Sequence, residues 1–236
     1  MPRIIGLAQA RMGSSRLPGK VMLLLAGRPL IGHIFDRLAA TPGVDGLVLA
    51  TTADARNDAL VGYAEERGIP VYRERLEDDI VARLAGAARF TGADAILKVN
   101  ADCPMVDPAI LARLVGTFRT QPETDYVSNK IVWTWPEGMS AEVIATGALE
   151  WCAANLSADA DRELVANWIR DHTERFSRLS VEADRDYMNL PKLSVDTPDD
   201  FALANRIFDA LFQSNPLFGF DDILAWLQAD LRSMDR

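Results

Sequence analysis

A short segment near the start of the chain concentrates residue types that bind phosphate groups. Residues 11–20 read Arg-Met-Gly-Ser-Ser-Arg-Leu-Pro-Gly-Lys and directly follow an apolar run over residues 4–10. The cations of this segment are Arg11, Arg16 and Lys20, and its small residues are Gly13, Ser14, Ser15 and Gly19. The cations can donate charge-assisted hydrogen bonds to phosphate oxygens, and glycine lets backbone N–H groups turn toward an anion. This segment, the phosphate loop, therefore predicts a triphosphate site.

The phosphate loop differs from the two common nucleotide-binding loops. A Walker A loop has four residues between its glycines and a Ser or Thr after its lysine. Here five residues separate Gly13 from Gly19, and Val21 follows Lys20. The dinucleotide fingerprint with its three glycines is absent as well. The alternative, a basic surface turn, is disfavoured because the loop comes directly after an apolar strand pattern.

The first half of the chain alternates strand and helix patterns, which indicates an α/β fold. Strands are predicted over residues 4–10, 46–52, 69–72 and 93–99, and helices over residues 55–67, 76–90 and 108–118. This alternation predicts a mostly parallel central sheet flanked by helices, of the Rossmann-like kind. Ligands of such sheets lie beyond the carboxyl ends of the strands, so the loops after Ala10, Thr52 and Val99 are expected to border one crevice.

The second half is less regular. Strands are predicted over residues 126–129, 142–144, 176–182 and 190–195, and helices over residues 147–155 and 159–172. A further helix is expected to begin after Thr197, because a hydroxyl cap, a proline and two acids suit a first turn. Residues 1–236 contain no linker or repeat and are expected to form one domain, with a small lobe inserted around residues 125–185.

Two aspartates follow predicted strands at the expected crevice. Asp102 comes after the strand over residues 93–99, and Asp196 comes after the strand over residues 190–195. Magnesium prefers oxygen ligands and is typically held by one or two carboxylates together with substrate phosphates. The residues alone leave two interpretations open. Asp102 and Asp196 either form a metal site, or Asp102 is a turn residue and Asp196 caps a helix.

Composition limits the class of function. The net charge is 25 − 34 = −9, which argues against a nucleic-acid-binding surface. Cys103 and Cys152 have neither the spacing of a metal site nor that of a disulfide framework. No apolar run is long enough for a membrane span, and no signal-peptide pattern is present, so a cytoplasmic protein with no membrane partner is expected.

Several separated strings resemble one known family. The phosphate loop is similar to the signature of the CMP-sugar synthetases, the cytidylyltransferases of the nucleotide-diphospho-sugar transferase superfamily. Its residue sequence is close to the version found in the spore coat polysaccharide biosynthesis protein F branch. The strings Ala-Asp-Cys-Pro over residues 101–104 and Val-Asp-Thr-Pro-Asp-Asp-Phe over residues 195–201 resemble the two acidic motifs of these enzymes. The resemblance extends from about residue 4 to residue 208.

This resemblance implies transfer of CMP from CTP to an acidic sugar or a related hydroxyl acceptor, with release of pyrophosphate. It implies that Asp102 and Asp196 bind Mg²⁺, for which Mn²⁺ can substitute, and that Arg11 and Lys20 act with them in catalysis. The nucleotide-binding residues that follow are Leu7, Gln9, Ala10, Arg11, Gly13, Ser14, Ser15, Arg16, Lys20, Thr51 and Asn100. A homodimer is also expected. The choice of CTP over other nucleotides rests on the resemblance, because the loop chemistry would serve any nucleotide.

The acceptor side is where the chain departs from the family. Acceptor-binding residues are expected to be Asn129, Ser140 and Glu142. The family usually has an aspartate where Ser140 stands, and a His-Val-Thr-Pro run where this chain has Leu-Val-Ala-Asn over residues 164–167. The acceptor therefore stays open: a sugar acid of the Kdo or sialic acid type, or a different hydroxyl or phosphonate compound. Trp133 and Trp135 are expected either to stack on an acceptor ring or to form a dimer contact.

Two other functions remain possible from the residues. One is a glycosyltransferase of similar topology that consumes a nucleotide sugar, but such enzymes usually carry an Asp-x-Asp where this chain has Asn100-Ala101-Asp102. The other is a protein that binds a nucleotide or a sugar without turnover. The two histidines, His33 and His172, are expected to serve structure or surface rather than catalysis.

Overall fold

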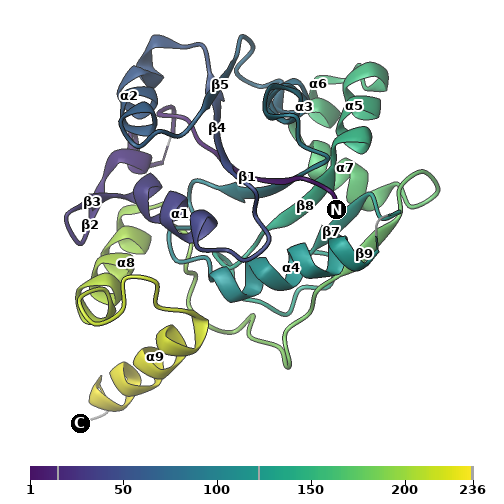
Figure 1. Cartoon of the computed structure of the whole chain (residues 1–236). Coiled ribbons are helices and arrows are strands. Elements are labelled where there is room, and N and C mark those ends of the chain that lie inside the picture. Colours follow the sequence, from purple (N-terminus) through teal and green to yellow (C-terminus); the bar gives the residue numbers. More distant parts are fainter. Residues whose placement is uncertain (15, 122, 235–236) are drawn as a thin grey trace.

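A twisted sheet forms the centre of the computed structural model, which describes residues 1–14, 16–121 and 123–234, with side chains up to residue 230. In the described part the sheet has seven strands in the order β5-β4-β1-β6-β8-β7-β9 (Figure 1). The parallel strands are β1 (Ile4–Gln9), β4 (Leu47–Thr52), β5 (Val71–Glu74) and β6 (Ala95–Asn100). The α/β fold predicted from the alternation is confirmed.

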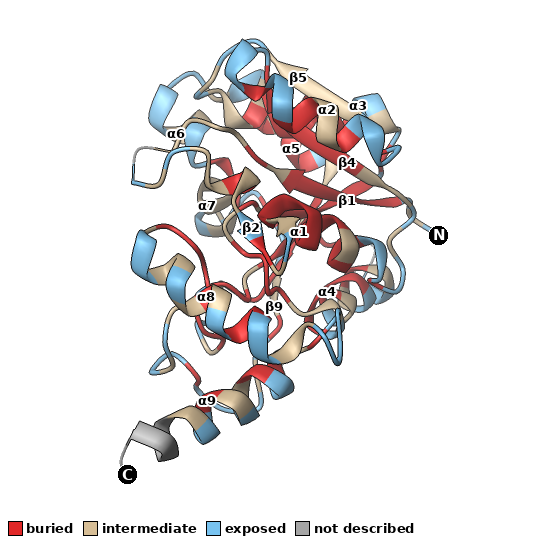
Figure 2. Cartoon of the chain, turned by 90° about the vertical axis from the view of Figure 1, so that its left-hand side faces the viewer, coloured by how far each residue is buried: buried red, intermediate tan, exposed pale blue. Residues whose placement is uncertain are grey.

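The alternation of side chains along β1 explains why this sheet is covered on both faces. Ile4 and Ala8 belong to the core on one face, whereas Ile5 and Leu7 belong to the core on the other. The first core packs against α1 (Leu30–Ala39), α2 (Asp58–Glu66) and α4 (Pro108–Thr120), and the second against α3 (Ile80–Thr91), α5 (Thr146–Asn155) and α7 (Val165–Asp171). Figure 2 shows the buried strands between helices whose outer faces are exposed.

Residues 125–185 extend this same sheet. Strand β8 (Glu142–Ala145) pairs antiparallel with both β6 and β7 (Tyr126–Ser128), and β9 (Arg178–Ser180) pairs parallel with β7. The smaller elements are the 3₁₀ helices η1 (Lys20–Met22) and η2 (Ala55–Asn57), the hairpin β2 (Leu24–Leu25) and β3 (Arg28–Pro29), and helix α6 (Asp159–Glu163). The segment predicted as an inserted lobe thus places Glu142 beside the central strands.

The C-terminal part adds two helices. Helix α8 (Pro198–Leu211) begins with a capping box, in which the Thr197 hydroxyl accepts from the Asp200 N–H and the Asp200 carboxylate accepts from the Thr197 N–H. The predicted helix start is therefore confirmed. Helix α9 (Phe220–Met234) extends from the body of the molecule toward the C-terminus (Figures 1 and 2). Among the described residues, no helix combines the length and apolar character that a membrane crossing requires.

Two predicted elements differ in the structure. Residues 190–195 are not a strand, because they do not pair with a single neighbouring strand. Instead, the Leu193 N–H donates to Glu137 O in one loop, and the Val195 N–H donates to Asp102 O in another. The helix predicted over residues 159–172 is divided into α6 and α7 at Leu164, whose φ of −102° and ψ of 30° are not helical. Three hydrogen bonds of 2.7–3.1 Å from Arg162 to Asp79 tie α6 to the start of α3 instead.

Candidate active site

A cavity of about 330 Å³ lies where β1 and β6 end, and the phosphate loop forms one of its walls. We name it the phosphate cavity. Its lining consists of Gln9, Ala10, Arg11, Gly13, Ser14, Arg16, Lys20, Val21, Asn100, Ala101, Asp102 and Asp196. The structure therefore brings most of the predicted nucleotide-binding residues together with both predicted metal ligands. Ser15 lies outside the described residues.

Lys20 connects the three segments that converge on the phosphate cavity. Its Nζ donates to Asp196 Oδ1 at 2.8 Å and to the carbonyl oxygen of Val195 at 2.8 Å, and it lies 3.8 Å from Asp102 Oδ2. The turn into η1 is made by Gly19, whose φ of 68° is a left-handed conformation that glycine adopts without strain. One ammonium group thus contacts both carboxylates, and the two acids are neighbours although 94 positions (196 − 102) separate them.

Asp196 is the most strongly held of these acids. Its other oxygen, Oδ2, accepts from Lys192 Nζ at 2.6 Å, and Arg16 Nη2 lies 2.9 Å from Oδ1. Burial opposes ionisation, but the hydrogen bonds from Lys192 and Lys20 outweigh it and lower the pKa of Asp196 to about 2. The Arg16 side chain is 63% exposed, so water screens its contact. Asp196 is therefore a carboxylate at any physiological pH.

Arg11 contacts the acidic segment over residues 77–78 rather than an aspartate of the phosphate cavity. Its Nη1 lies 3.1 Å from Glu77 Oε1 and 3.3 Å from Asp78 Oδ1. Glu77 also contacts Arg56 Nη2 at 3.3 Å. These groups are partly exposed, so the pairs are weak, and Arg11 can exchange them for phosphate oxygens at little cost.

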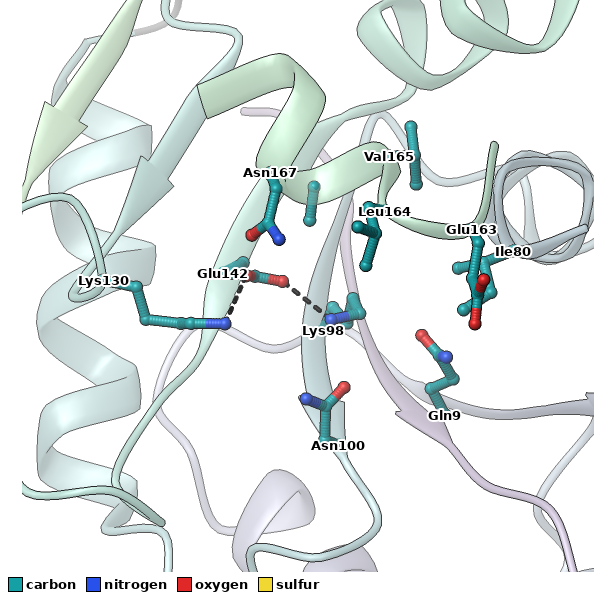
Figure 3. Close-up of a pocket in the computed structure, with 11 residues that line it drawn as sticks. Gln9, Ile80, Lys98, Asn100, Lys130, Glu142, Glu163, Leu164, Val165 and Asn167 are labelled. Carbon is teal, nitrogen blue, oxygen red and sulfur yellow. Dashed lines mark hydrogen bonds and ion pairs between the residues drawn. The ribbon is translucent and has the colours of Figure 1, made fainter. Parts of the chain in front are cut away.

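A second cavity, of about 190 Å³, adjoins the phosphate cavity, because Gln9 and Asn100 line both. We name it the lysine cavity. Figure 3 shows Lys98 and Lys130 pointing at Glu142 from two sides. Lys98 Nζ donates to Glu142 Oε2 at 2.8 Å, and Lys130 Nζ lies 3.4 Å from Oε1. The other lining residues are Ile80, Glu163, Leu164, Val165, Ala166 and Asn167.

Strand register creates the pair of Lys98 and Glu142. The two residues lie directly opposite each other in the antiparallel ladder between β6 and β8, on the same face of the sheet. Burial alone would raise the pKa of Glu142, but the charges of Lys98 and Lys130 and the hydrogen bonds of Lys98 and Tyr126 lower it to about 2. Glu142 is thus a buried carboxylate that stays ionised through its lysine partners.

Lys98 and Lys130 were missed by sequence reasoning, although the sequence held a signal for them. The chain has 25 Lys and Arg residues, of which only Lys20, Lys98, Lys130 and Lys192 are lysines. All of these lysines contact carboxylates at the two cavities or beside them. The only signal in the sequence was therefore that lysine is scarce, which does not by itself show which acids the lysines contact.

Comparison with known proteins identifies the family. The family model described as cytidylyltransferase matches residues 5–219. The chain belongs to the cytidylyltransferase family. The spore coat polysaccharide biosynthesis protein SpsF of Bacillus subtilis is 27% identical over 215 residues, which cover 88% of this chain and 87% of that protein.

Solved structures agree with this assignment. A cytidylyltransferase from Leptospira borgpetersenii superposes with a TM-score of 0.91 at 25% identity, over 98% of this chain and 96% of that one. The fold of CMP:2-keto-3-deoxy-manno-octonic acid synthetase, solved in complex with CTP, is similar with a TM-score of 0.68 at 17% identity, over 88% of this chain and 99% of that one. Nucleotidyl transfer from CTP is therefore the activity class, in preference to glycosyl transfer or binding without turnover.

Several predicted site residues lie elsewhere in this cytidylyltransferase. The backbone groups of Leu7 were expected to help recognise the base, but Leu7 is fully buried and its backbone pairs with strands on both sides. Thr51 is fully buried as well, and neither residue lines the two cavities. The side-chain amide of Asn129 donates to Met139 O and accepts from Ala141 N–H. These bonds shape the loop before β8, and Asn129 is only 1% exposed. Trp135 is buried and donates to Val181 O, so it is a core residue and not a stacking platform.

The histidines are structural, as predicted. His33 is buried, lies against the Phe208 ring, and donates from Nε2 to Leu25 O at 2.8 Å. Burial lowers its pKa to about 4. His172 stacks on Trp168 at 3.7 Å between ring centroids. Neither histidine lines the phosphate cavity or the lysine cavity, so neither is placed to act as a base there.

The donor set of the phosphate cavity fits a hard divalent cation bound together with phosphates. The described residues contain no cluster of three or more His, Cys, Asp or Glu side chains that could bind a metal without help. Asp102 and Asp196 supply two carboxylates within reach of one ammonium group, and two carboxylates are the usual protein share of a magnesium site.

The oligomeric state and the cellular location of the protein stay predictions.

Proposed function

We propose that this cytidylyltransferase transfers CMP from CTP to a hydroxyl group of an acidic sugar or a related acceptor, with Mg²⁺, and releases pyrophosphate. The observation that carries the proposal is the contact of one ammonium, that of Lys20, with both Asp102 and Asp196 inside the phosphate cavity. Cations for a triphosphate and carboxylates for a metal thus lie in one cavity. The lysine cavity beside it offers a place for the acceptor.

In this reaction the acceptor oxygen forms a bond to the α-phosphorus, and the bond from that phosphorus to the bridging oxygen of the β-phosphate breaks. The hydroxyl proton is released, and pyrophosphate leaves with the electron pair. Arg11, Arg16 and Lys20 are the cations that bind the β- and γ-phosphates and stabilise the charge of the leaving group. Positioning by these groups accounts for most of the catalysis, because phosphoryl-type transfer needs little covalent help from a protein.

Asp102 and Asp196 are the proposed ligands of Mg²⁺. When bound, the metal polarises the α-phosphate and lowers the pKa of the acceptor hydroxyl. The low pKa of Asp196 supports this role, because the carboxylate needs no deprotonation before it binds a cation. Lys20 must then leave Asp196 for a phosphate oxygen, and its flexible side chain permits this exchange.

The departures from the family lie at the lysine cavity or directly beside it. Leu164 and Asn167 line it, and Ser140 lines a small adjoining cavity together with Lys98, Lys130 and Glu142. Replacement of an aspartate by Ser140 leaves this wall less anionic. These positions support an acceptor that differs from the commonest substrate of the branch, with a bulkier or more acidic group.

A screen of acidic sugars with CTP, scored by pyrophosphate release, tests the proposal. We expect release with one acceptor class, loss of release after chelation, and recovery with Mg²⁺ or Mn²⁺. Asp196→Asn should remain folded and lose metal-dependent turnover, whereas the matched control Asp199→Asn, an exposed acid three positions later in the first turn of α8, should stay active. Full activity of Asp196→Asn, or no release with any acidic acceptor, would refute the proposal.

A further inference from the structure

The lysine cavity has an excess of positive charge in its buried wall. Lys98, Lys130 and Glu142 have side chains that are 9%, 20% and 3% exposed, so two ammonium groups face one carboxylate. Glu163 also lines the cavity, but it is exposed and solvated. Buried charge is costly unless it is compensated. The wall is therefore best satisfied by an occupant that carries a negative charge.

The two lysines are held unequally. Lys98 lies in the sheet opposite Glu142 and forms the shorter contact, 2.8 Å. Lys130 follows the end of β7, is more exposed, and lies 3.4 Å from Glu142 and 5.7 Å from the centre of the Trp133 ring. Each of these Nζ atoms has one hydrogen bond to a described residue, of the three that an ammonium can donate. Lys130 is thus the cation with the freedom to bind a ligand.

Glu142 has little capacity left for an acceptor hydroxyl. Its Oε2 accepts from Lys98, and its Oε1 contacts Lys130 and accepts from the Tyr126 hydroxyl at 3.2 Å. Because both carboxylate oxygens are occupied, this side chain holds its neighbours in place and is not free to bind a substrate. Glu142, predicted to bind the acceptor, is better described as a positioning residue for the two lysines.

We propose that Lys130 binds the acid group of the acceptor, a carboxylate or phosphonate oxyanion, while the pair of Lys98 and Glu142 forms its rigid support. The inference rests on the proposed function for the identity of the acceptor, but not for the existence of the oxyanion site. Gln9, Asn100 and Asn167 line the same cavity with amide groups that suit neutral sugar hydroxyls. Lys130 therefore determines specificity for acidic over neutral acceptors.

The small number of lysines makes a direct binding test possible. Selective ¹³C labelling of lysine should give one ε-methylene NMR signal for each of the four side chains, each assigned by its loss in a Lys→Arg variant. We expect the Lys130 signal to shift saturably with sodium acetate and with methylphosphonate, but not with sodium chloride at equal ionic strength. A shift of the Lys20 signal would report anion binding in the phosphate cavity and can be distinguished from binding at Lys130. A Lys130 signal that is unmoved, or moves equally with chloride, overturns the proposal.

Variants separate binding from structure. Lys98 lines the same cavity, so its signal should respond to acetate as well, and in Lys130→Met this response should disappear. In the matched control Arg113→Met it should persist, because Arg113 likewise lies over a tryptophan ring, that of Trp135 at 5.6 Å, but lines neither cavity. Persistence of the response in Lys130→Met assigns the anion to another group and refutes the inference.

Kinetics add a second readout. With an acidic sugar that releases pyrophosphate, Lys130→Met should raise the acceptor KM about tenfold or more, as expected for loss of one charge-assisted hydrogen bond. The KM for CTP and kcat should change less than about twofold, and Lys130→Arg should restore much of the loss. A raised KM for CTP instead would overturn the assignment. An anion response at Lys130 without pyrophosphate release from any acceptor would refute the proposed function and leave the oxyanion site intact.

Discussion

Lys20 and the proposed metal compete for the same carboxylates, so removal of Lys20 should affect metal affinity and turnover in opposite directions. Lys20→Met should bind Mn²⁺ more tightly than the unmodified protein in the absence of nucleotide, although its turnover of CTP should fall. Mn²⁺ is a suitable probe because it is paramagnetic and takes the same oxygen ligands as Mg²⁺. Opposite changes in metal affinity and activity would distinguish this exchange from simple damage to the site.

The size of the effect follows from the contacts of the ammonium. Lys20 Nζ lies 2.8 Å from Asp196 Oδ1 and 3.8 Å from Asp102 Oδ2, and its side chain is 12% exposed. A metal that binds both acids must displace at least one charge-assisted hydrogen bond, worth about 1.5–3 kcal/mol. Each 1.4 kcal/mol corresponds to about tenfold in affinity. We therefore expect Mn²⁺ to bind about tenfold to a hundredfold more tightly to Lys20→Met.

Water-proton relaxation or electron paramagnetic resonance during a Mn²⁺ titration measures this affinity directly. The double variant Lys20→Met/Asp196→Asn is the control, because it lacks both the competing cation and one of the proposed ligands and should lose the gain. Thermal unfolding checks that each variant is folded. Equal or weaker Mn²⁺ binding by Lys20→Met would refute the competition, and a gain that survives in the double variant would place the metal elsewhere.

Three further predictions concern stability. The pKa of Glu142 is depressed from 4.5 to about 2, so its contribution of about 3 kcal/mol is present above pH 4.5 and is lost as the pH falls through 2. Chemical unfolding of Glu142→Gln should therefore show a deficit at pH 7 that closes between pH 5 and pH 2; a deficit independent of pH would contradict the ionised pair. Gly138→Ala should destabilise by at least about 2 kcal/mol, because φ is +105° and an added Cβ would lie 2.4 Å from Leu193 C. Gly116→Ala, in open space within α4, should not destabilise, and equal melting temperatures would count against the clash. Thr197→Ala should cost about 1 kcal/mol through loss of the cap of α8, and an unchanged free energy of unfolding would show that Asp200 alone is sufficient.

The sequence alone determined those features that depend on neighbours along the chain. The alternation of strand and helix patterns in the first half of the chain predicts a mostly parallel sheet flanked by helices, because parallel strands need crossover connections that pack on its faces. The phosphate loop could be recognised because its cations and glycines lie within ten residues. The cap of α8 could be predicted because Thr197 and Asp200 interact within one turn.

Only the tertiary structure decided which distant residues meet. Lys98 and Glu142 are paired because β8 joins β6 antiparallel in one particular register, and a shift by one residue would have turned Glu142 to the opposite face. The pattern over residues 190–195 suits a strand, but a strand also needs a neighbour, and here the segment is held by two different loops. Thr51 shows the same limit, since sequence places it at a strand end but only packing decides that it is buried. Local pattern therefore predicted residues that gather at the phosphate cavity, whereas the walls of the lysine cavity depend on register and packing between segments far apart in the chain.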